Sequence, residues 1–440
     1  MFDSDAVRPE RGRGPSRSVS LLILVALAAC RPARLDSAAV LKSLREQQPA
    51  VSLSAPLDAE AAVTLAMANN RSLGPAREQT GVARASLKAA TDISNPTIRV
   101  VHDDLNIPSR AGWQLSARWA PPKPWELATE SELARREIDK AEEELAEATL
   151  ALASDVKREH AELVSVESEL EVAKASADSR RALVAAIEAR VAKGAGTRLD
   201  LASAKVSVAE AEATIAELGA SRATTVERLR GLMGLAPGES YSVKGEPAPR
   251  RDVPLGAALE ELALSKRPAL RVDWARHAAQ AEEVALARME NLPWFKIVAG
   301  PRMELTPAIN RTAFNIGLEF SFPLWDWNTG HIALEEAKLK RDEARYRAEV
   351  TNLRRDVAVA RSDLEARRAA VEQLEKQLLP ALEARLDAAK KGLEAAQLDT
   401  TVLLEAEEQV WKGRRQLVRA NRELKQAWIR LERVLGVPVP

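Results

Sequence analysis

The sequence predicts a mainly α-helical protein with a small membrane β part, in which one strand–strand–long-helix pattern is written twice. Ala, Glu, Leu, Arg and Lys dominate the 440 residues and aromatic residues make up only 4%, a composition typical of long helices and coiled coils. Short segments that alternate apolar and polar residues indicate strands with two unlike faces. Both kinds of segment recur about 200 residues further along the chain, which predicts a structural duplication.

The N-terminal segment fits a secretory signal peptide. Arg-rich residues up to Arg17 precede the apolar run VSLLILVALAA at 19–29. A helix needs about 20 residues to cross a bilayer core, so this run is too short to span one, and it matches the apolar region of a signal peptide. We therefore predict a signal peptide over 1–29 and an N-terminal linker over 30–56.

Cys30 is the only cysteine, so a disulfide within the chain is excluded. The sequence Leu-Ala-Ala-Cys that ends at this residue resembles a bacterial lipobox, whose cysteine is lipidated and becomes the first residue after cleavage. This resemblance implies that Cys30 is the lipidation site, and Arg31, which is not an aspartate, fits sorting to the outer membrane. The alternative is an ordinary signal peptide followed by an incidental cysteine.

Internal matches divide the remaining chain into two repeats. Pro96 matches Pro293 at an offset of 197 residues, whereas Gly234 matches Gly436 at an offset of 202. The register therefore slips by five residues, and the matches place the slip between 96 and 121, where a loop tip tolerates an insertion. The predicted domains are a first repeat over 57–238, a linker over 239–254 and a second repeat over 255–440.

Each repeat contains two predicted strands. They lie at about 96–104, 112–120, 294–304 and 313–322. The alternation is clearest at Phe314, Ile316 and Leu318, which are separated by polar or small residues. Lengths of about 9–11 residues suit tilted membrane-spanning strands. The alternative is a pair of soluble hairpins, which stays open because Arg99 and Arg118 fall near the first pair.

The rest of each repeat is predicted to be helical. The first repeat offers helices of about 37 residues over 57–94, about 70 over 125–193 and about 37 over 198–235. Apolar and small residues at a spacing of three to four, such as Ala134 and Ile138, indicate a coiled-coil seam. The long helix would measure about 105 Å, which matches two short helices end to end. We therefore expect each long helix to pack antiparallel against a pseudo-continuous pair.

A single copy cannot complete this architecture. Alanine-rich seams bury little apolar area per residue, and four strands leave two open edges, which lipid does not tolerate. Three copies supply twelve strands and twelve helical columns. The sequence thus predicts a homotrimer in which an α-helical barrel is stacked on a 12-stranded β-barrel, with four strands from each chain.

Several function classes receive no support. The formal net charge is zero, so we predict no nucleic-acid partner. The four histidines are scattered without a helical i, i+4 pair, and we predict no metal site and no cofactor. The sequence shows no nucleophile–base pair and no phosphate-binding loop, so we expect a protein that is not an enzyme.

Motifs in a fixed order resemble those of the TolC-like outer-membrane efflux proteins over about residues 53–440. These are LAMANNRSL (65–73), LALSKRPAL (262–270), NPTIRV (95–100), FPLWDWNTGHIALEEA (322–337), GAGTRLDLASA (194–204) and the degenerate AQLDTTVLLEA (396–406). The resemblance implies the exit duct of a tripartite efflux system in the outer membrane of a Gram-negative bacterium, anchored by lipid and extending into the periplasm. The Pro-Leu-Trp-Asp form is similar to the cation-efflux branch, although substrate choice in the family normally belongs to the other components.

The resemblance also assigns roles to two helical hairpin tips, at about 193–200 and 394–402. In the family these tips converge to constrict the channel and meet the periplasmic adaptor of an inner-membrane pump. By position, the aperture residues are Asp200, Glu405 and Arg198, and a threefold ring of carboxylates there would attract cations. The candidate adaptor-docking residues are Gly194, Gly196, Leu199, Ala396 and Leu398. An aspartate at a helix start is otherwise an N-terminal cap, and this alternative stays open for Asp200.

A competing prediction is a periplasmic coiled-coil adaptor or structural lipoprotein without a channel. It keeps the helices and Cys30 but treats both strand pairs as soluble hairpins. The strands distinguish the two predictions, because a membrane channel needs strands of about ten residues with one face that tolerates lipid.

Overall fold

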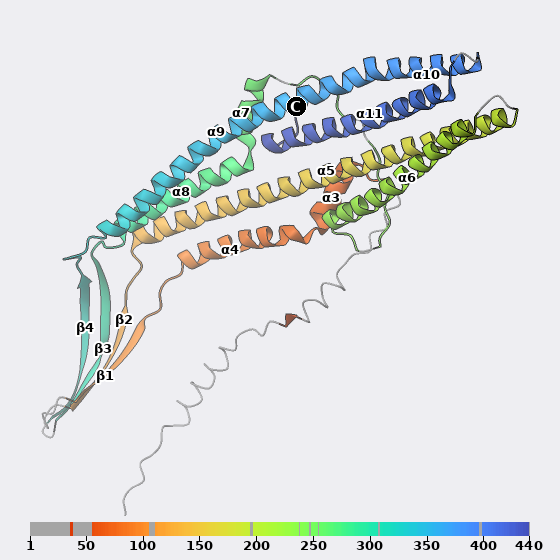
Figure 1. Cartoon of the computed structure of the whole chain (residues 1–440). Coiled ribbons are helices and arrows are strands. Elements are labelled where there is room, and N and C mark those ends of the chain that lie inside the picture. Colours follow the sequence, from red (N-terminus) through yellow and green to blue (C-terminus); the bar gives the residue numbers. More distant parts are fainter. Residues whose placement is uncertain are drawn as a thin grey trace, which may run out of the picture. The chain divides into compact units, whose positions relative to one another are not determined.

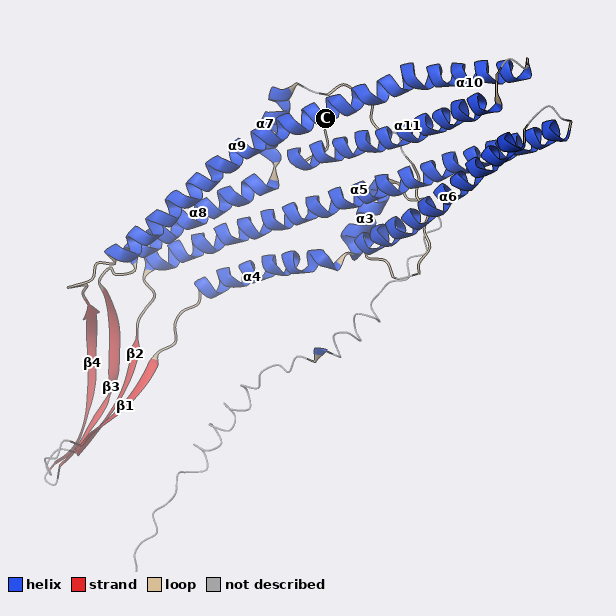
Figure 2. Ribbon diagram, viewed as in Figure 1, coloured by secondary structure: helices blue, strands red, loops and turns tan. Residues whose placement is uncertain are grey.

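The computed structural model describes residues 36–37, 55–104, 111–193, 197–236, 238–245, 248–253, 255–306, 309–395 and 398–439. Residues 51–440 form one compact unit, which is mostly helical and contains one four-stranded sheet (Figures 1 and 2). The predicted signal peptide and its cysteine, Cys30, lie outside the described residues.

The order of elements repeats along the chain. The first half contains α3 (Ala59–Asn69), the 3-10 helix η1 (Arg71–Leu73), α4 (Gly74–Ala90), β1 (Thr97–Asp104), β2 (Ala111–Trp119), α5 (Pro124–Ala192) and α6 (Arg198–Met233). The second half contains α7 (Gly256–Lys266), α8 (Pro268–Met289), β3 (Trp294–Thr306), β4 (Ile309–Ser321), α9 (Thr329–Gln373), the π-helix η2 (Leu374–Leu378), α10 (Leu379–Glu394) and α11 (Thr400–Leu435). Each half therefore runs from two short helices through two strands to a long helix and a helix of 36 residues.

Both halves build one sheet in the order β1-β2-β3-β4, with every neighbouring pair antiparallel. β2 and β3 pair across the junction of the two halves, and β1 and β4 form the outer edges. β3 and β4 are each 13 residues long, and β4 begins at Ile309, four residues before the predicted position. The four strands thus form a single sheet, and its two edges have no pairing strand among the described residues.

The two halves also pack in the same way. α3 packs on α5 and α6, and α7 packs on α9 and α11. Gly234 and Gly436 end α6 and α11 with φ of 68° and 79°, a conformation that glycine adopts without strain. A Cβ on Gly234 would lie 2.7 Å from the Asn69 carbonyl carbon, and one on Gly436 would lie 2.9 Å from the Lys266 oxygen. Asn69 and Lys266 are 197 residues apart, so the same close contact occurs twice.

The predicted continuous opening helix over 57–94 is wrong. Asn70 adopts an extended conformation between α3 and α4, and its side-chain Oδ1 accepts from the Ser72 N–H at 2.8 Å. The Asn70 Nδ2 donates to the Leu232 carbonyl at 2.7 Å, which fixes the break against α6. In the second half Arg267 is extended because the next residue is Pro268.

The long helix of the first half agrees with the prediction, but that of the second half is interrupted. α5 has 69 residues, about 100 Å at 1.5 Å per residue, and it packs against α4 and α6. In the second half a π-helical turn over Leu374–Leu378 separates α9 from α10. Pro380 lies just after this turn and has no N–H to bond to the carbonyl four residues earlier, so the π-turn coincides with a lost helical hydrogen bond.

Polar pairs join α5 and α11 along much of their length. They are Asp155–Arg433 at 3.7 Å, Lys157–Glu432 at 3.4 Å, Glu162–Arg422 at 3.0 Å, Glu169–Arg419 at 2.9 Å and Ser179–Glu407 at 3.1 Å. The residue numbers rise along α5 as they fall along α11, which gives the antiparallel register of the two helices. These contacts hold the two repeats together within one chain.

Candidate functional site

The first hairpin tip begins where α5 ends at Ala192 and closes where α6 begins at Arg198. Thr197 and Asp200 form a reciprocal capping box. The Thr197 Oγ1 accepts from the Asp200 N–H, and the Asp200 Oδ2 accepts from the Thr197 N–H, both at 3.0 Å. The hydrogen bonds from Thr197 lower the pKa of Asp200. The first role of this carboxylate is therefore to cap α6, and it stays ionised at neutral pH.

The second tip, between α10 and α11, is closed by an apolar contact. Asp399 is the N-cap of α11 but makes no side-chain capping hydrogen bond. The Leu398 N–H instead donates to the Gly392 carbonyl at 3.2 Å. A Cβ on Gly392 would lie 2.5 Å from the Leu398 Cδ1, so this glycine makes room for the leucine. The two tips match in sequence but are stabilised differently.

The other predicted tip residues lie on the surface or outside the described part of the chain. Leu199 is 75% exposed, and Arg198 and Glu405 are exposed as well. Arg198 makes no ion pair with any residue that the structure describes. Gly194, Gly196 and Ala396 lie outside the described residues. An exposed leucine beside a charged turn is a surface on which another protein can pack.

Above the tips, the two hairpins contact each other through a small apolar cluster and a buried acid. The cluster contains Ala389, Leu403 and Ala406, with Leu183, Leu386 and Leu393 at its margin. Glu407 is 5% exposed, and its Oε1 accepts from the Ser179 hydroxyl. Separation of the hairpins at this level exposes the apolar cluster to water and breaks this hydrogen bond.

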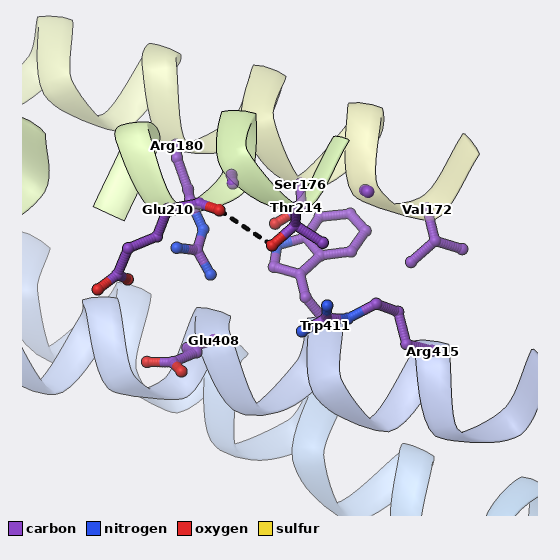
Figure 3. A pocket seen from close by; sticks show the side chains of 10 residues that line it. Val172, Ser176, Arg180, Glu210, Thr214, Glu408, Trp411 and Arg415 are labelled. Carbon is purple, nitrogen blue, oxygen red and sulfur yellow. Dashed lines mark hydrogen bonds between the residues drawn. The ribbon is translucent and has the colours of Figure 1, made fainter. Parts of the chain in front are cut away.

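A cavity of about 120 Å³ lies next to this contact, between α5, α6 and α11 (Figure 3). The Arg180 Nη1 donates to the Ser207 carbonyl at 2.8 Å across the α5–α6 pair. Lys412, by its hydrogen bond, lowers the pKa of Glu408, which faces the cavity from α11 with Trp411. Ligand sites usually enclose about 300–1,000 Å³. The cavity is therefore a gap in the packing of three helices and is too small for a cargo site.

The sheet has one apolar and one polar face. In the antiparallel register Ile98 lies opposite Ala117, Ala117 opposite Ala299, and Ala299 opposite Ile316, so these residues share a face. Large apolar side chains cover that face and are more than 40% exposed. They are Ile98, Val100, Leu115, Met303, Phe314, Ile316, Leu318 and Phe320. A broad apolar face in contact with solvent is unusual for a soluble sheet.

The opposite face is polar and carries Arg99 and Arg118, the two residues that left soluble hairpins open as an alternative. Arg99 lies opposite Ser116, and Arg118 lies opposite Val298, on the face that does not carry the large apolar residues. The Arg118 Nη1 is 3.8 Å from the Glu319 carboxylate on the same face. The arginines therefore do not interrupt the apolar face. The period-two alternation of a strand separates the two kinds of side chain.

Aromatic residues cluster where the sheet meets the helices. The Trp294 Nε1–H donates to the Pro121 carbonyl at 2.6 Å, and its ring packs edge-on against Trp125 with centroids 5.0 Å apart. These contacts pack the segment that joins β2 to α5 against the segment that joins α8 to β3. At the passage from β4 to α9, by contrast, Trp325 is 94% and Trp327 is 62% exposed.

Acidic residues gather between α8 and α9 close to the sheet. Burial raises the pKa of Glu283, and the neighbouring Glu335 carboxylate raises it further. The Lys338 ammonium, by its hydrogen bond, lowers the pKa of Glu335. Among the described residues no group of three His, Cys, Asp or Glu side chains is arranged to hold a metal ion. None of the described helices is both long enough and apolar enough to cross a membrane.

A family model described as outer membrane efflux protein matches residues 126–235 and 259–437. This chain belongs to that family. It is 27% identical over 403 residues to the cobalt-zinc-cadmium resistance protein CzcC of Cupriavidus metallidurans, covering 87% of this chain and 90% of the relative.

Solved structures share the fold of this efflux protein. CusC, described as forming a transmembrane channel, matches with a TM-score of 0.75 and 18% identity, over 89% of this chain and 96% of its own. The outer-membrane channel OprN matches with a TM-score of 0.74 and 20% identity, over 86% and 89%. The outer membrane protein VceC of Vibrio cholerae matches with a TM-score of 0.72 and 18% identity, over 87% and 97%. The predicted family and fold class, mainly α-helical with a small antiparallel sheet, are thus confirmed.

Proposed function

We propose that three copies of this efflux protein assemble into the exit channel of a tripartite efflux system. The observation that carries this proposal is the sheet, which has one apolar face, one polar face and two unpaired edges, β1 and β4. An open edge in lipid leaves backbone groups without hydrogen bonds. Pairing β4 of each copy with β1 of the next closes a 12-stranded barrel, with the apolar face toward lipid and the polar face toward water.

The internal duplication supports the same assembly. Trp327 matches Trp125 at the offset of 202 residues that also relates Gly234 to Gly436. Trp125 is covered by Trp294 at the passage where β2 and β3 lie side by side. Trp327 lies at the passage that follows β4, beside which the described residues place no further strand. In the trimer a neighbouring copy covers Trp327. Its β1 pairs with β4 in the way that β3 pairs with β2 within one chain.

The helical tips are the proposed contact with the rest of the pump. Leu199 and the surrounding surface of the first tip are the docking site for a periplasmic adaptor, which connects the channel to an inner-membrane pump. Asp200 and Glu405 line the aperture, and Arg198 lies beside them. Metal cations are the proposed cargo, because the relative CzcC is named for resistance to cobalt, zinc and cadmium.

Cys30 is the proposed lipid anchor of the mature protein in the outer membrane. The supporting observation is its place at the end of the apolar run 19–29. A Cys30→Ser variant is expected to lose the lipid label and to leave the outer-membrane fraction. Incorporation of radioactive palmitate, followed by membrane fractionation, measures both. Unchanged labelling of the serine variant would contradict the assignment.

Cysteine cross-linking tests the assembly. Thr97 and Ser321 lie near the helical ends of β1 and β4, on the two edges of the sheet. Within one chain these strands are separated by three strand spacings, about 14 Å, which a disulfide with Cα atoms about 5.5 Å apart cannot bridge. The double variant Thr97→Cys/Ser321→Cys should therefore form covalent dimers and trimers in outer membranes. Each single variant is the control, and an absence of ladders specific to the double variant would refute the closed barrel.

A further inference from the structure

The polar face of the sheet carries more basic than acidic residues. The strand register assigns to this face five basic residues and three acidic ones. The basic residues are Arg99, Arg118, Lys296, Arg302 and Arg311, and the acidic ones are Asp103, Glu304 and Glu319. The apolar face carries a single charged residue, Asp104, at the end of β1. The polar face thus has a net charge of +2 in each chain.

Two of the three acidic residues of this face lie opposite basic ones in the strand register, whereas Asp103 lies opposite Gly112. Lys296 lies directly opposite Glu319, and Arg118 approaches the same carboxylate within 3.8 Å. Glu304 lies opposite Arg311 in the register of β3 and β4. Arg99 lies opposite Ser116, a neutral residue, and is exposed. Its charge is therefore available to ions in the water that this face contacts.

We propose that the barrel lumen is a basic, anion-preferring exit. The inference rests on the proposed trimer, in which the polar face lines the water-filled interior. Three chains then place six net positive charges around one lumen, and rings of Arg and Lys favour anions in pores. Twelve tilted strands at about 4.8 Å spacing enclose a barrel about 24 Å across between backbones. Every point in the lumen therefore lies within half of that diameter from the wall.

The salt dependence of this effect follows from the size of the lumen. The Debye length is about 30 Å at 0.01 M salt and about 3 Å at 1 M. The wall charges therefore act across the whole lumen at low salt and only near the wall at high salt. A metal cation that leaves through this barrel crosses it accompanied by anions, since the fixed charge draws anions into the lumen.

The test is the ion preference of full-length trimers in planar lipid bilayers, measured as the reversal potential in a gradient of potassium chloride. The wild-type channel is expected to pass chloride more readily than potassium at about 0.01 M, with the preference lost near 1 M. Arg99→Glu reduces the net charge of the polar face to zero in each chain and should abolish the preference. Arg99→Lys keeps the charge and should retain it.

A second variant keeps the test independent of Arg99. Asn315 lies on the polar face between the apolar Phe314 and Ile316, and Asn315→Glu halves the net charge without removing a basic residue. It should weaken the chloride preference to an intermediate value. A conducting wild-type trimer that prefers potassium, or a preference that Arg99→Glu leaves unchanged, would overturn the basic exit. Failure to form trimers or to conduct at all would instead overturn the proposed channel.

Discussion

Ile316→Arg is the substitution that separates a membrane barrel from a soluble sheet most sharply. Ile316 lies near the middle of β4, on the apolar face, and its side chain is 77% exposed in one chain. On the lipid face of a barrel an arginine near the bilayer midplane costs about 2–4 kcal/mol. With three copies the trimer loses about 6–12 kcal/mol, and 1.4 kcal/mol already corresponds to a tenfold change in an equilibrium constant. If the face were in water, the same change would be close to neutral.

The matched control is Asn315→Arg, one residue away on the polar face. This substitution adds the same side chain to the same strand but directs it to the lumen, where we expect a cost well under 1 kcal/mol. The assay compares trimer yield in outer membranes at equal expression, followed by guanidinium titration of the trimers in lipid vesicles. Ile316→Arg should give little trimer with a lower midpoint. Equal yields and midpoints for both variants would refute the lipid-facing assignment.

Three further predictions concern stability. Gly300→Ala places a Cβ 2.0 Å from the Leu115 carbonyl oxygen, so β2 and β3 must separate. We expect the free energy of trimer unfolding to fall by at least about 1–3 kcal/mol. The control is Gly317→Ala, whose added Cβ meets no atom within 4 Å and should leave stability close to that of the wild type. Asp200→Ala removes the carboxylate half of the capping box of α6, leaves Thr197 as the N-cap, and should cost about 1 kcal/mol in urea titration. Because hydrogen bonds lower the pKa of Asp200 in the folded state, its contribution is complete above the ordinary carboxyl pKa and is lost as the pH falls through the lowered value, so the stabilities of wild type and variant should converge as the pH falls below that lowered value. Glu283→Gln should raise the melting temperature at pH 7, because burial penalises the charged form of Glu283 and raises its pKa; at pH 4 the gain should vanish, and an equal gain at both pH values would exclude charge burial as its cause.

The sequence predicted the duplication because the repeated contacts depend on particular residues. Gly234 and Gly436 end equivalent helices with positive φ, which few other residues tolerate, so both the residue type and the spacing persist. The two strand pairs were predictable because alternation in β4 follows directly from its two unlike faces. The break between α3 and α4 at Asn70 was not predicted. It depends on two hydrogen bonds of the Asn70 side chain, one from the Ser72 N–H and one to the Leu232 carbonyl of α6, and the second of these is visible only in three dimensions.

The site was predicted less completely than the fold. The Leu-Asp pattern located both tips, but it did not reveal that Asp200 forms a capping box while Asp399 caps nothing with its side chain. At the offset of 202 residues Thr197 corresponds to Asp399, which is also an N-cap, but Asp200 corresponds to Val402, which has no carboxylate to complete a capping box. The polar pairs that join α5 and α11 were also not predicted. Their partners are more than 200 residues apart, and only the three-dimensional register pairs Glu169 with Arg419.

The most direct test of the central claim is the mass of the particle that detergent extracts from outer membranes, determined by light scattering with the detergent contribution subtracted. We expect a particle of three chains, because only a closed ring pairs the edge of β4 with the edge of β1. A homogeneous particle of one chain, folded and stable, would contradict it.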